Sequence, residues 1–218
     1  HAINYLENSK RFPTNAIFGF VTMINKLLEE TKPDYFAAVF DSGGKSFRND
    51  IFDEYKANRG EAPEDISLQF PIIIDFLKAK GVRVLSMENY EADDVIGSLV
   101  KKFKSKHNII ILSGDKDFTQ LIDSKVTMID TMRNRTTSVD EVVKKYGLSP
   151  KQMIDFFSLV GDSIDNIPGV KGIGEKGAKA LIAQWGNLEN MLDNLEFLEP
   201  SRLQKALDLF KENELEKS

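Results

Sequence analysis

Carboxylate side chains form four short clusters along this chain, and each cluster comes where a strand or a helix is expected to end. Position carries the information, because 34 acidic residues in 218 will form some pairs by chance. Carboxylates that converge on one spot cannot stay ionised there without cations, so the pattern is typical of a multi-metal site. The eight residues are Asp41; Glu91, Asp93 and Asp94; Asp115 and Asp117; and Asp162 and Asp165.

Three of the clusters follow short apolar runs that favour β-structure. Residues 35–40 lead directly to Asp41, residues 108–112 lead to Asp115, and residues 82–85 precede Glu91 by a few positions. Helical spacing of apolar residues then follows over 92–103. Alternating strands and helices predict an α/β fold with a mainly parallel central sheet flanked by helices. Loops at the carboxyl ends of such strands meet in one crevice, which the acidic clusters would share.

The expected ligand chemistry is that of a hard cation. Carboxylate oxygens prefer Mg²⁺ or Mn²⁺, and the chain has no Cys that would suggest a thiolate site. Two such ions a few Å apart can hold the attacking and leaving oxygens of a phosphoryl transfer. The residues therefore favour phosphodiester hydrolysis.

Composition sets the broad class of the protein. A hydrophobic content of 41% supports a real core, and no apolar run approaches the roughly 20 residues of a membrane span. We expect a soluble, intracellular protein without a signal peptide or disulfides. The formal net charge is −5, but setting the eight clustered carboxylates aside leaves the rest at +3. A basic surface around a metal-filled acidic crevice suits a polyanionic substrate.

The pattern along the chain predicts two modules. Residues 1–137 form the α/β domain, with helices over 14–30 and 66–79, a fourth strand over 126–129 and a loop over 131–137. A long basic and aromatic insertion, about 43–65, lies beside the expected site. Residues 138–218 are predicted to form a helical module, with helices over 138–146, 150–160, 175–184 and about 200–211 and a capping box at Ser138 and Glu141.

A glycine-rich segment over 169–177 predicts a tight hairpin between two helices. The second helix would begin near Glu175, and its exposed backbone N–H groups could hold a DNA phosphate without reading sequence. Three lysines lie in or next to this segment: Lys171, Lys176 and Lys179.

Each motif also has a simpler interpretation. Acids at a helix start complement the helix dipole, Lys56 and Arg59 could lie on a solvated helix face, Tyr55 could be partly buried, and the glycine segment could be an ordinary corner between helices. The segment after Asp115 lacks the ligands of a calcium loop, and Val39 stands where a P-loop requires Gly, which disfavours both sites.

Six motifs, in order, resemble the 5′-nuclease family over nearly the whole chain. The resemblance is closest to the N-terminal 5′-3′ exonuclease domain of bacterial DNA polymerase I and to related flap endonucleases. The motifs are Asp41 with Phe47 and Arg48; residues 55–59; residues 90–94; residues 114–117; residues 161–169; and the glycine hairpin.

The resemblance implies a PIN/resolvase-like domain with an arch over about 43–65, and a helix-hairpin-helix module that grips duplex DNA. By this resemblance Asp41, Glu91, Asp93 and Asp94 would serve one metal, and Asp115, Asp117, Asp162 and Asp165 a second, both Mg²⁺ or Mn²⁺. Lys56 and Arg59 would steady the scissile phosphate. Further DNA contacts would come from Arg48, Tyr55, Lys171, Gly172, Gly174, Lys176, Gly177 and Lys179, with K⁺ at the hairpin.

The implied activity is 5′-3′ exonuclease and flap endonuclease action during replication and repair. The expected partners are branched or 5′-flap DNA, RNA–DNA primer junctions and a covalently following polymerase domain, for a cytoplasmic, nucleoid-associated monomer. The family starts with a strand that carries another metal-ligand Asp before a His-Ala pair; this chain starts at His1, and we expect truncation of the sequence. Two alternatives stay open: a catalytically impaired module that binds branched DNA, and a ribonuclease of related fold.

Overall fold

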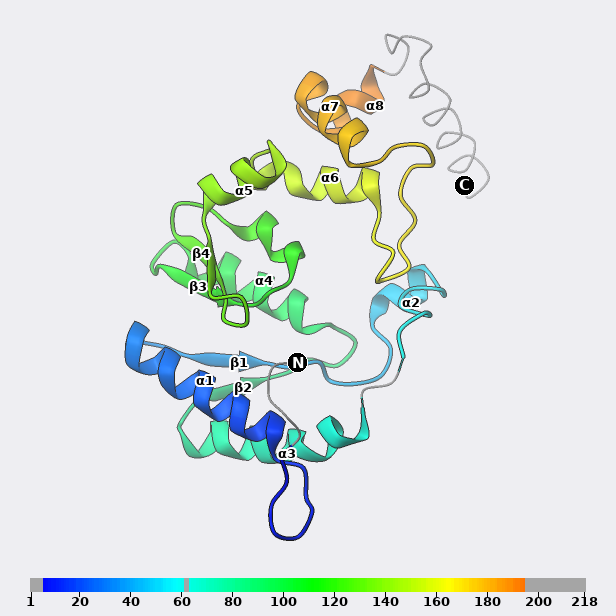
Figure 1. Cartoon of the computed structure of the whole chain (residues 1–218). Helices are drawn as coiled ribbons and strands as arrows, with labels where there is room; N and C mark the ends of the chain where they lie inside the picture. Colours follow the sequence, from blue (N-terminus) through cyan, green and yellow to red (C-terminus); the bar gives the residue numbers. More distant parts are fainter. Residues whose placement is uncertain (1–5, 61–62, 195–218) are drawn as a thin grey trace. The chain divides into compact units, whose positions relative to one another are not determined.

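The computed structural model describes residues 6–60 and 63–194 and divides into two compact units (Figure 1). The first contains His1–Ile51 and Gly60–Ile96, and the second contains Phe52–Arg59 and Gly97–Ser218. His1, Ala2 and the helix expected over about 200–211 lie outside the described residues. In the described ranges, no helix is both long enough and apolar enough to cross a bilayer.

The first unit has a small parallel sheet with two long helices against it (Figure 1). Strand β1 pairs in parallel with β2, so that Ala37 lies opposite Arg83 and Val39 opposite Leu85. Both strands match the expected apolar runs. The elements are α1 (Asn15–Thr31), β1 (Ala37–Val39), α2 (Phe47–Ile51), α3 (Glu64–Ala79), β2 (Arg83–Leu85) and the start of α4 (Ala92–Phe103).

A buried glutamine joins the two long helices. Gln69 of α3 is completely buried, and its Oε1 accepts hydrogen bonds from the backbone N–H groups of Ala16 (2.8 Å) and Ile17 (3.1 Å). Its Nε2 donates to Asn15 Oδ1 and to the carbonyl of Asp65. Helix N-termini leave their first N–H groups without intrahelical partners, and Gln69 satisfies two of them for α1. The core beside it centres on Ile73, Leu77 and Val82.

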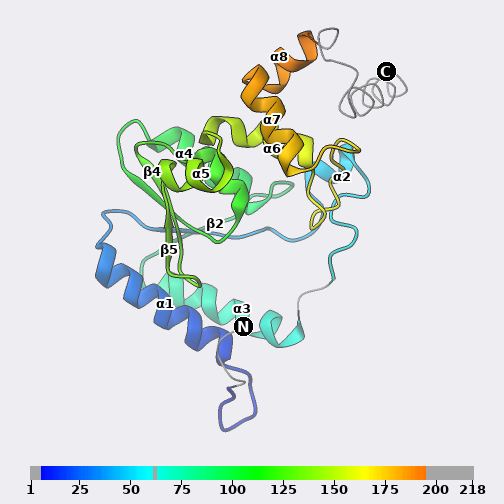
Figure 2. The ribbon, with the colours of Figure 1, turned by 45° about the horizontal axis from the view of Figure 1, so that its top comes forward.

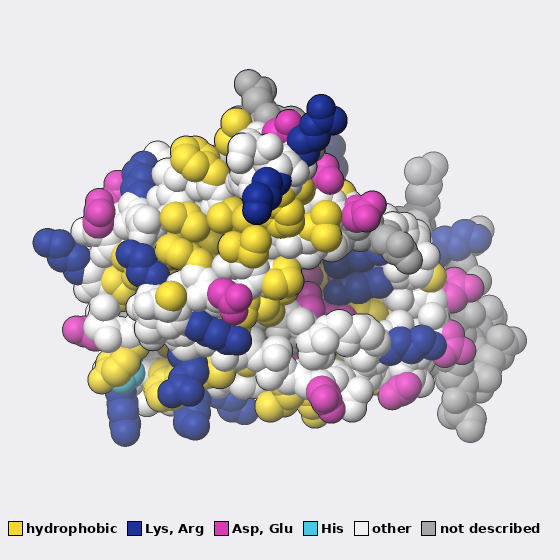
Figure 3. All heavy atoms as spheres, turned by 90° about the horizontal axis from the view of Figure 1, so that it is seen from below, with side chains coloured by type: hydrophobic (Ala, Val, Ile, Leu, Met, Phe, Trp, Pro, Cys, Tyr) yellow, Lys and Arg dark blue, Asp and Glu magenta, His cyan; other side chains and the backbone are white. Residues whose placement is uncertain are grey.

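The face on which α1 and α3 lie carries a band of hydrophobic side chains (Figure 3). Four apolar residues of α3 and one of α1 are more than a third exposed. The apolar surface of these helices is therefore wider than the stripe that covers the sheet. The residues are Phe18, Ile66, Leu68, Phe70 and Ile72.

The second unit combines a three-stranded sheet with a series of helices (Figure 2). Its strand order is β3-β4-β5, with β3 and β4 parallel and β4 and β5 antiparallel. Helix α6 packs against α7, and α7 against α8. Besides the rest of α4, the elements are β3 (Ile109–Leu112), η1 (Lys116–Leu121), β4 (Val126–Asp130), β5 (Arg135–Thr137), α5 (Val139–Tyr146), η2 (Pro150–Gln152), α6 (Met153–Val160), α7 (Glu175–Trp185) and α8 (Leu188–Asp193).

The sheets differ from the sequence expectation in two respects. Residues 135–137, expected within a loop, form β5, because a turn with Asn134 in the left-handed region (φ 47°) returns the chain antiparallel to β4. Strand pairing within the described residues also gives two sheets, one in each unit, where one central sheet was expected. The expected parallel pairings are present within each sheet.

Local signals account for the starts of the helices in the second unit. Ser138 accepts a hydrogen bond from the backbone N–H of Glu141 (3.5 Å) and begins α5, whereas the full capping box forms at Ser149 and Gln152. Gly147 ends α5 in the left-handed conformation (φ 72°) that suits glycine. The expected helices over 138–146, 150–160 and 175–184 are thus present, while η1 and α8 were not anticipated.

Candidate metal and nucleic-acid site

In the first unit, three of the predicted acids surround the start of α4. Asp41 follows β1, and its Oδ1 accepts a hydrogen bond from the backbone N–H of Ala92 (2.7 Å). Asp94 Oδ2 accepts from the N–H of Glu91 (3.0 Å). Asp93 lies in the same first turn. Strand β1 and the N-terminus of α4 therefore bring Asp41, Glu91 and Asp94 together.

Polar side chains from the segment after β1 hold this acidic group. Arg48 donates two parallel hydrogen bonds to Asp94, from Nη1 (2.7 Å) and Nη2 (2.8 Å). Ser46, 7% exposed, donates its hydroxyl hydrogen to Glu91 Oε1 (3.1 Å). The bidentate pairing of Arg48 with Asp94 fixes the orientation of both side chains. Arg48, predicted to contact DNA, lies here against a predicted metal ligand.

In the second unit, the loop after β3 presents Asp115 and Asp117. The hydroxyl of Ser113 accepts from the N–H of Asp115 (3.0 Å), and Asp115 Oδ1 accepts from the N–H of Asp117 (2.9 Å). Asp115 therefore caps η1 with one carboxylate oxygen. Its other oxygen is not used in that cap.

The other two acids of this unit lie on the connection between α6 and α7. Asp162 and Ile167 exchange two backbone hydrogen bonds, of 2.9 and 2.7 Å, which close a tight loop around Asp165. Asp162 Oδ1 also accepts from the N–H of Ile164 (2.8 Å). The loop geometry thus fixes both carboxylates relative to the α6 terminus.

Cations of the same unit lie against these carboxylates. Lys116 Nζ is 2.7 Å from Asp162 Oδ2, Lys56 Nζ is 3.8 Å from Asp165 Oδ2, and Arg59 forms an ion pair with Asp165. Lys56 holds a left-handed backbone conformation (φ 57°), and its N–H donates to the carbonyl of Asp165 (2.9 Å). The structure therefore brings the predicted basic pair together with Asp165, one of the predicted second-metal acids.

Tyr55 lies in the same contact region. Its side chain is 7% exposed, and its hydroxyl is 3.5 Å from Asp165 Oδ2. The amides of Asn58 and Asn166 donate across this region to the carbonyls of Ser163 (2.9 Å) and Glu54 (2.8 Å). Contact of the Tyr55 ring with DNA stays a prediction, and it requires the ring to leave this buried position.

The electrostatics of the second unit indicate excess negative charge around Asp117. Burial, together with the charge of Asp115, raises the pKa of Asp117 to about 6, against the opposing effect of Lys116. Burial would also raise the pKa of Asp162, but the hydrogen bond from Lys116 and further N–H donors hold that pKa below its ordinary value. The positive charge of Lys116 thus offsets the negative charge of Asp162 more completely than that of Asp117.

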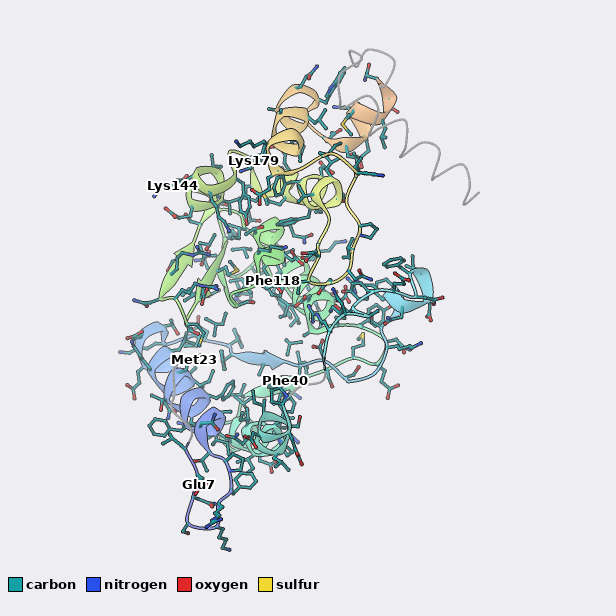
Figure 4. All side chains as sticks on the ribbon, turned by 45° about the vertical axis from the view of Figure 1, so that its right-hand side comes forward. Glu7, Met23, Phe40, Phe118, Lys144 and Lys179 are labelled. Carbon is teal, nitrogen blue, oxygen red and sulfur yellow. The ribbon has the colours of Figure 1, made fainter. Side chains whose placement is uncertain are left out.

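These groups line a pocket of about 720 Å³ in the second unit. Acidic residues on one part of its wall adjoin a basic part that comes from β5, α5 and the turn before β5. Lys144, which is labelled in Figure 4, belongs to the α5 portion of this basic part. The charged residues of the lining are Arg59, Asp115, Lys116, Asp117, Arg133, Arg135, Glu141, Lys144, Lys145, Asp162 and Asp165.

The donor set fits a hard divalent cation in its chemistry. The ligands available are carboxylate oxygens, which such a cation prefers. As arranged, however, no three His, Asp or Glu side chains of residues 6–60 and 63–194 form one metal-holding group. Arg48, Lys116 and Arg59 instead neutralise Asp94, Asp162 and Asp165. The assignment of all eight acids as metal ligands stays a prediction.

The predicted DNA-contacting glycines lie on the connection before α7 and in its first turn. Gly172 has φ 89°, and Gly174 is the N-cap of α7. Lys171 and Lys176 are exposed there. Gly177 lies one turn further, with Ile173 against it. Exposed N–H groups at this helix start are suited to an anion.

Lys179 points away from that helix start. Its Nζ lies 5.8 Å from the ring centroid of Tyr146 and 5.9 Å from that of Phe156, so it contacts α5 and α6 (Figure 4). Cation–π contacts at this range stabilise the packing of the helices.

Sequence reasoning did not single out three residues that the structure places around the predicted ligands. Ser46 binds Glu91, Lys116 binds Asp162, and the buried Asp130 lies against Gly114, the residue before Asp115. Only Lys116 had a sequence signal, because it stands between two predicted ligands.

An α/β unit with acids at its strand ends, followed by a helical module, is the architecture of a resolvase-like nuclease. Residues 1–147 match the 5′-3′ exonuclease N-terminal resolvase-like domain, and residues 148–217 match the 5′-3′ exonuclease C-terminal SAM fold. The chain belongs to the 5′-3′ exonuclease family. The predicted division at 137 and 138 stays a prediction.

Curated relatives include both polymerases and a free-standing nuclease. The chain is 43% identical over 211 residues to DNA polymerase I of Caldicellulosiruptor bescii, covering 94% of this chain and 25% of that protein. It is 38% identical over 218 residues to the 5′-3′ exonuclease of Aquifex aeolicus, covering 100% of this chain and 74% of that protein. The chain thus spans about a quarter of the length of the first and three quarters of the second.

Solved structures share the fold. T5 5′-exonuclease with bound zinc has a TM-score of 0.78 at 24% identity, covering 89% of this chain and 76% of that one. The catalytic core of Rad2 in complex with DNA substrate has a TM-score of 0.57 at 21% identity, covering 95% and 66%.

Proposed function

We propose that this chain is a divalent-metal-dependent, structure-specific 5′-3′ exonuclease and 5′-flap endonuclease. It hydrolyses DNA phosphodiesters near 5′ ends by a two-metal mechanism, as in primer and flap removal during replication and repair. Membership of the 5′-3′ exonuclease family supports the reaction class.

One observation carries the proposal. Four acids, Asp115, Asp117, Asp162 and Asp165, line one pocket together with Arg59. Carboxylates suit metal ions, whereas a guanidinium suits a phosphate, and phosphodiester hydrolysis requires both beside each other. The resemblance to T5 and Rad2 structures, which hold metal ions and DNA substrate respectively, supports the same assignment.

In this proposal, one set of residues binds the metal ions and another binds the scissile phosphate. Asp41, Glu91, Asp93 and Asp94 would hold one Mg²⁺ or Mn²⁺, and Asp115, Asp117, Asp162 and Asp165 the other. When bound, such ions lower the pKa of water and neutralise developing charge on the phosphate. Lys56 and Arg59 donate hydrogen bonds to the non-bridging oxygens of the scissile phosphate, where negative charge increases in the transition state.

DNA contacts come from both charge and backbone. Lys171, Lys176 and the N–H groups at the start of α7 would hold phosphates of the duplex beyond the cleavage point, with K⁺ at the glycine segment. Arg48 and Tyr55, in the arch over about 43–65, would contact the DNA strand that enters the site. Specificity then follows from duplex shape and a frayed 5′ strand rather than from base edges.

The proposed setting is that of a bacterial DNA-processing enzyme. The chain acts as a monomer in the bacterial cytoplasm, at the nucleoid, on branched DNA and RNA–DNA primer junctions. A covalently following polymerase domain belongs to the proposed setting, because the relative from Caldicellulosiruptor bescii is a DNA polymerase I of which this chain spans 25%.

A substrate panel tests the proposal. The chain is incubated in Mg²⁺ and in Mn²⁺ with end-labelled 5′-flap duplex, blunt duplex and an RNA hairpin. We expect cleavage of the flap duplex near its 5′ junction, with much slower cleavage of the other two. Tight flap binding without cleavage in either metal would favour the impaired DNA-binding module, and preferential cleavage of the RNA hairpin would favour the ribonuclease; either result contradicts the proposal.

A further inference from the structure

Lys116 occupies an unusual position among the predicted ligands of the second unit. It stands between Asp115 and Asp117 in the sequence, and its Nζ lies 2.7 Å from Asp162 Oδ2. The two acids next to it come from the loop after β3, whereas Asp162 comes from the connection after α6. The Lys116–Asp162 pair therefore joins the loop after β3 to the connection after α6.

The surroundings hold this ammonium group in place. Its Nζ lies 5.4 Å from the ring centroid of Phe157, on α6, which provides a cation–π contact on one side. The side chain of Asp162 is only 15% exposed, and that of Lys116 is 38% exposed. A partly dehydrated pair of this geometry is stronger than an ion pair on an open surface.

An ammonium group at this distance of 2.7 Å from a carboxylate forms a charge-assisted hydrogen bond with it. Lys116 therefore supplies positive charge directly at Asp162.

We propose that Lys116 is the internal counter-ion of Asp162 and that it competes with a divalent cation for this carboxylate. The inference rests on the proposed function, since it takes Asp162 as a metal ligand. Lys116 acts through Asp162 and is a positioning residue: it holds the loop after β3 against Asp162 before the cation arrives. The same charge lowers the affinity of the group for that cation.

A metal-binding titration tests the competition. The 218-residue chain and its Lys116→Gln, Lys116→Arg and Lys144→Gln variants are titrated with Mn²⁺, and free Mn²⁺ is measured by its electron paramagnetic resonance signal. Lys116→Gln should bind Mn²⁺ about 3- to 10-fold more tightly, the range of a partly exposed ion pair. Lys116→Arg keeps the charge and should bind as the wild type does.

Lys144→Gln is the matched control. Lys144 lines the same pocket, but its ion-pair partner is Glu141 at 3.5 Å, so this variant removes one charge without uncovering Asp162. It should bind Mn²⁺ with nearly wild-type affinity. If Lys144→Gln tightened binding as much as Lys116→Gln, a general charge effect would replace the proposed competition.

Thermal unfolding separates competition from a purely structural role. Lys116→Gln should lower the Tm of the metal-free protein, because Asp162 loses its counter-ion, and this loss should largely disappear at saturating Mn²⁺. Equal losses with and without Mn²⁺ would overturn the inference. Phe157→Leu keeps the charge but removes its ring contact, and should tighten Mn²⁺ binding to a smaller extent.

The two proposals fail differently. If the wild type and every variant leave all Mn²⁺ free, the metal-dependent function is wrong and the inference with it. If the wild type binds Mn²⁺ but Lys116→Gln binds with equal or lower affinity, only the inference on Lys116 is overturned.

Discussion

Gly161 and Gly169 lie with their backbones in direct contact. A Cβ placed on Gly161 would come within 2.3 Å of the Gly169 nitrogen, and one placed on Gly169 within 2.2 Å of the Val160 carbonyl oxygen. Gly161 also has φ 75°, a conformation that other residues rarely adopt. This contact closes the base of the loop that carries Asp162 and Asp165.

Alanine at either glycine should destabilise the protein. Gly161→Ala and Gly169→Ala should each cost about 3 kcal/mol or more, because backbone atoms must move apart. Gly97→Ala is the control: it lies within α4, where an added Cβ would meet nothing within 4 Å, and should stabilise by about 0.5–1 kcal/mol. Urea unfolding measures all three, and wild-type stability of Gly161→Ala would contradict the close contact.

Removal of the Gln69 amide should destabilise the first unit. Gln69→Leu leaves the N–H groups of Ala16 and Ile17 without their acceptor in a buried setting, at a cost of about 2–4 kcal/mol. Gln184→Leu, at an exposed position of α7, should change stability by less than about 0.5 kcal/mol. Equal effects of the two changes in urea unfolding would show that Gln69 does not cap α1.

Asp130 should make the stability of the protein depend on pH. It is 2% exposed. The hydrogen bond from the backbone N–H of Arg133 and the Arg133 guanidinium both lower the pKa of Asp130. They outweigh burial, which raises the pKa, and hold it below the ordinary value. A carboxyl group whose pKa is lower in the folded protein than in the unfolded chain stabilises the folded state at pH values above its unfolded pKa, about 3.9. This stabilisation is lost as the pH falls through the folded pKa.

Asp130→Asn should therefore lower Tm at pH 7, and its difference from the wild type should shrink as the pH falls below about 4. Scanning calorimetry of the two proteins at pH 7 and at pH values below about 4 measures the difference in Tm. A difference that is constant with pH would contradict the role of the Asp130 charge.

Arg59 and Lys56 should matter more for cleavage than for binding. Arg59→Ala and Lys56→Ala should each slow single-turnover cleavage of a 5′-flap duplex about 100-fold, as expected when a donor to a developing charge is removed. Lys26→Ala, an exposed position on α1, is the control and should cut normally. Weaker flap binding with an unchanged cleavage step would assign the pair to binding alone.

Much of the fold could be predicted from sequence because its signals are local. The apolar runs over 35–40, 82–85 and 108–112 indicated strands β1, β2 and β3, and periodic apolar residues indicated α1, α3 and α4. β5 could not be predicted in this way, since Arg135, Thr136 and Thr137 lack apolar alternation and pair only through the hairpin after β4.

The site could be predicted less completely than the fold. Motif positions marked the eight acids, but the partner of each depends on loops that bring distant residues together. Lys116 and Asp162 are 46 positions apart in the sequence, and Gln69 reaches Ala16 across 53. No periodicity encodes such contacts, because they follow from tertiary structure.

The most direct test of the central claim is cleavage of a labelled 5′-flap duplex in Mg²⁺ by the Asp115→Asn, Asp117→Asn double variant. The account predicts a cleavage rate at least about 100-fold below the wild type, with flap binding and circular dichroism unchanged. Glu141→Gln removes another acid of the same pocket and should leave the rate near wild type. Full Mg²⁺-dependent cleavage by the double variant would contradict the account.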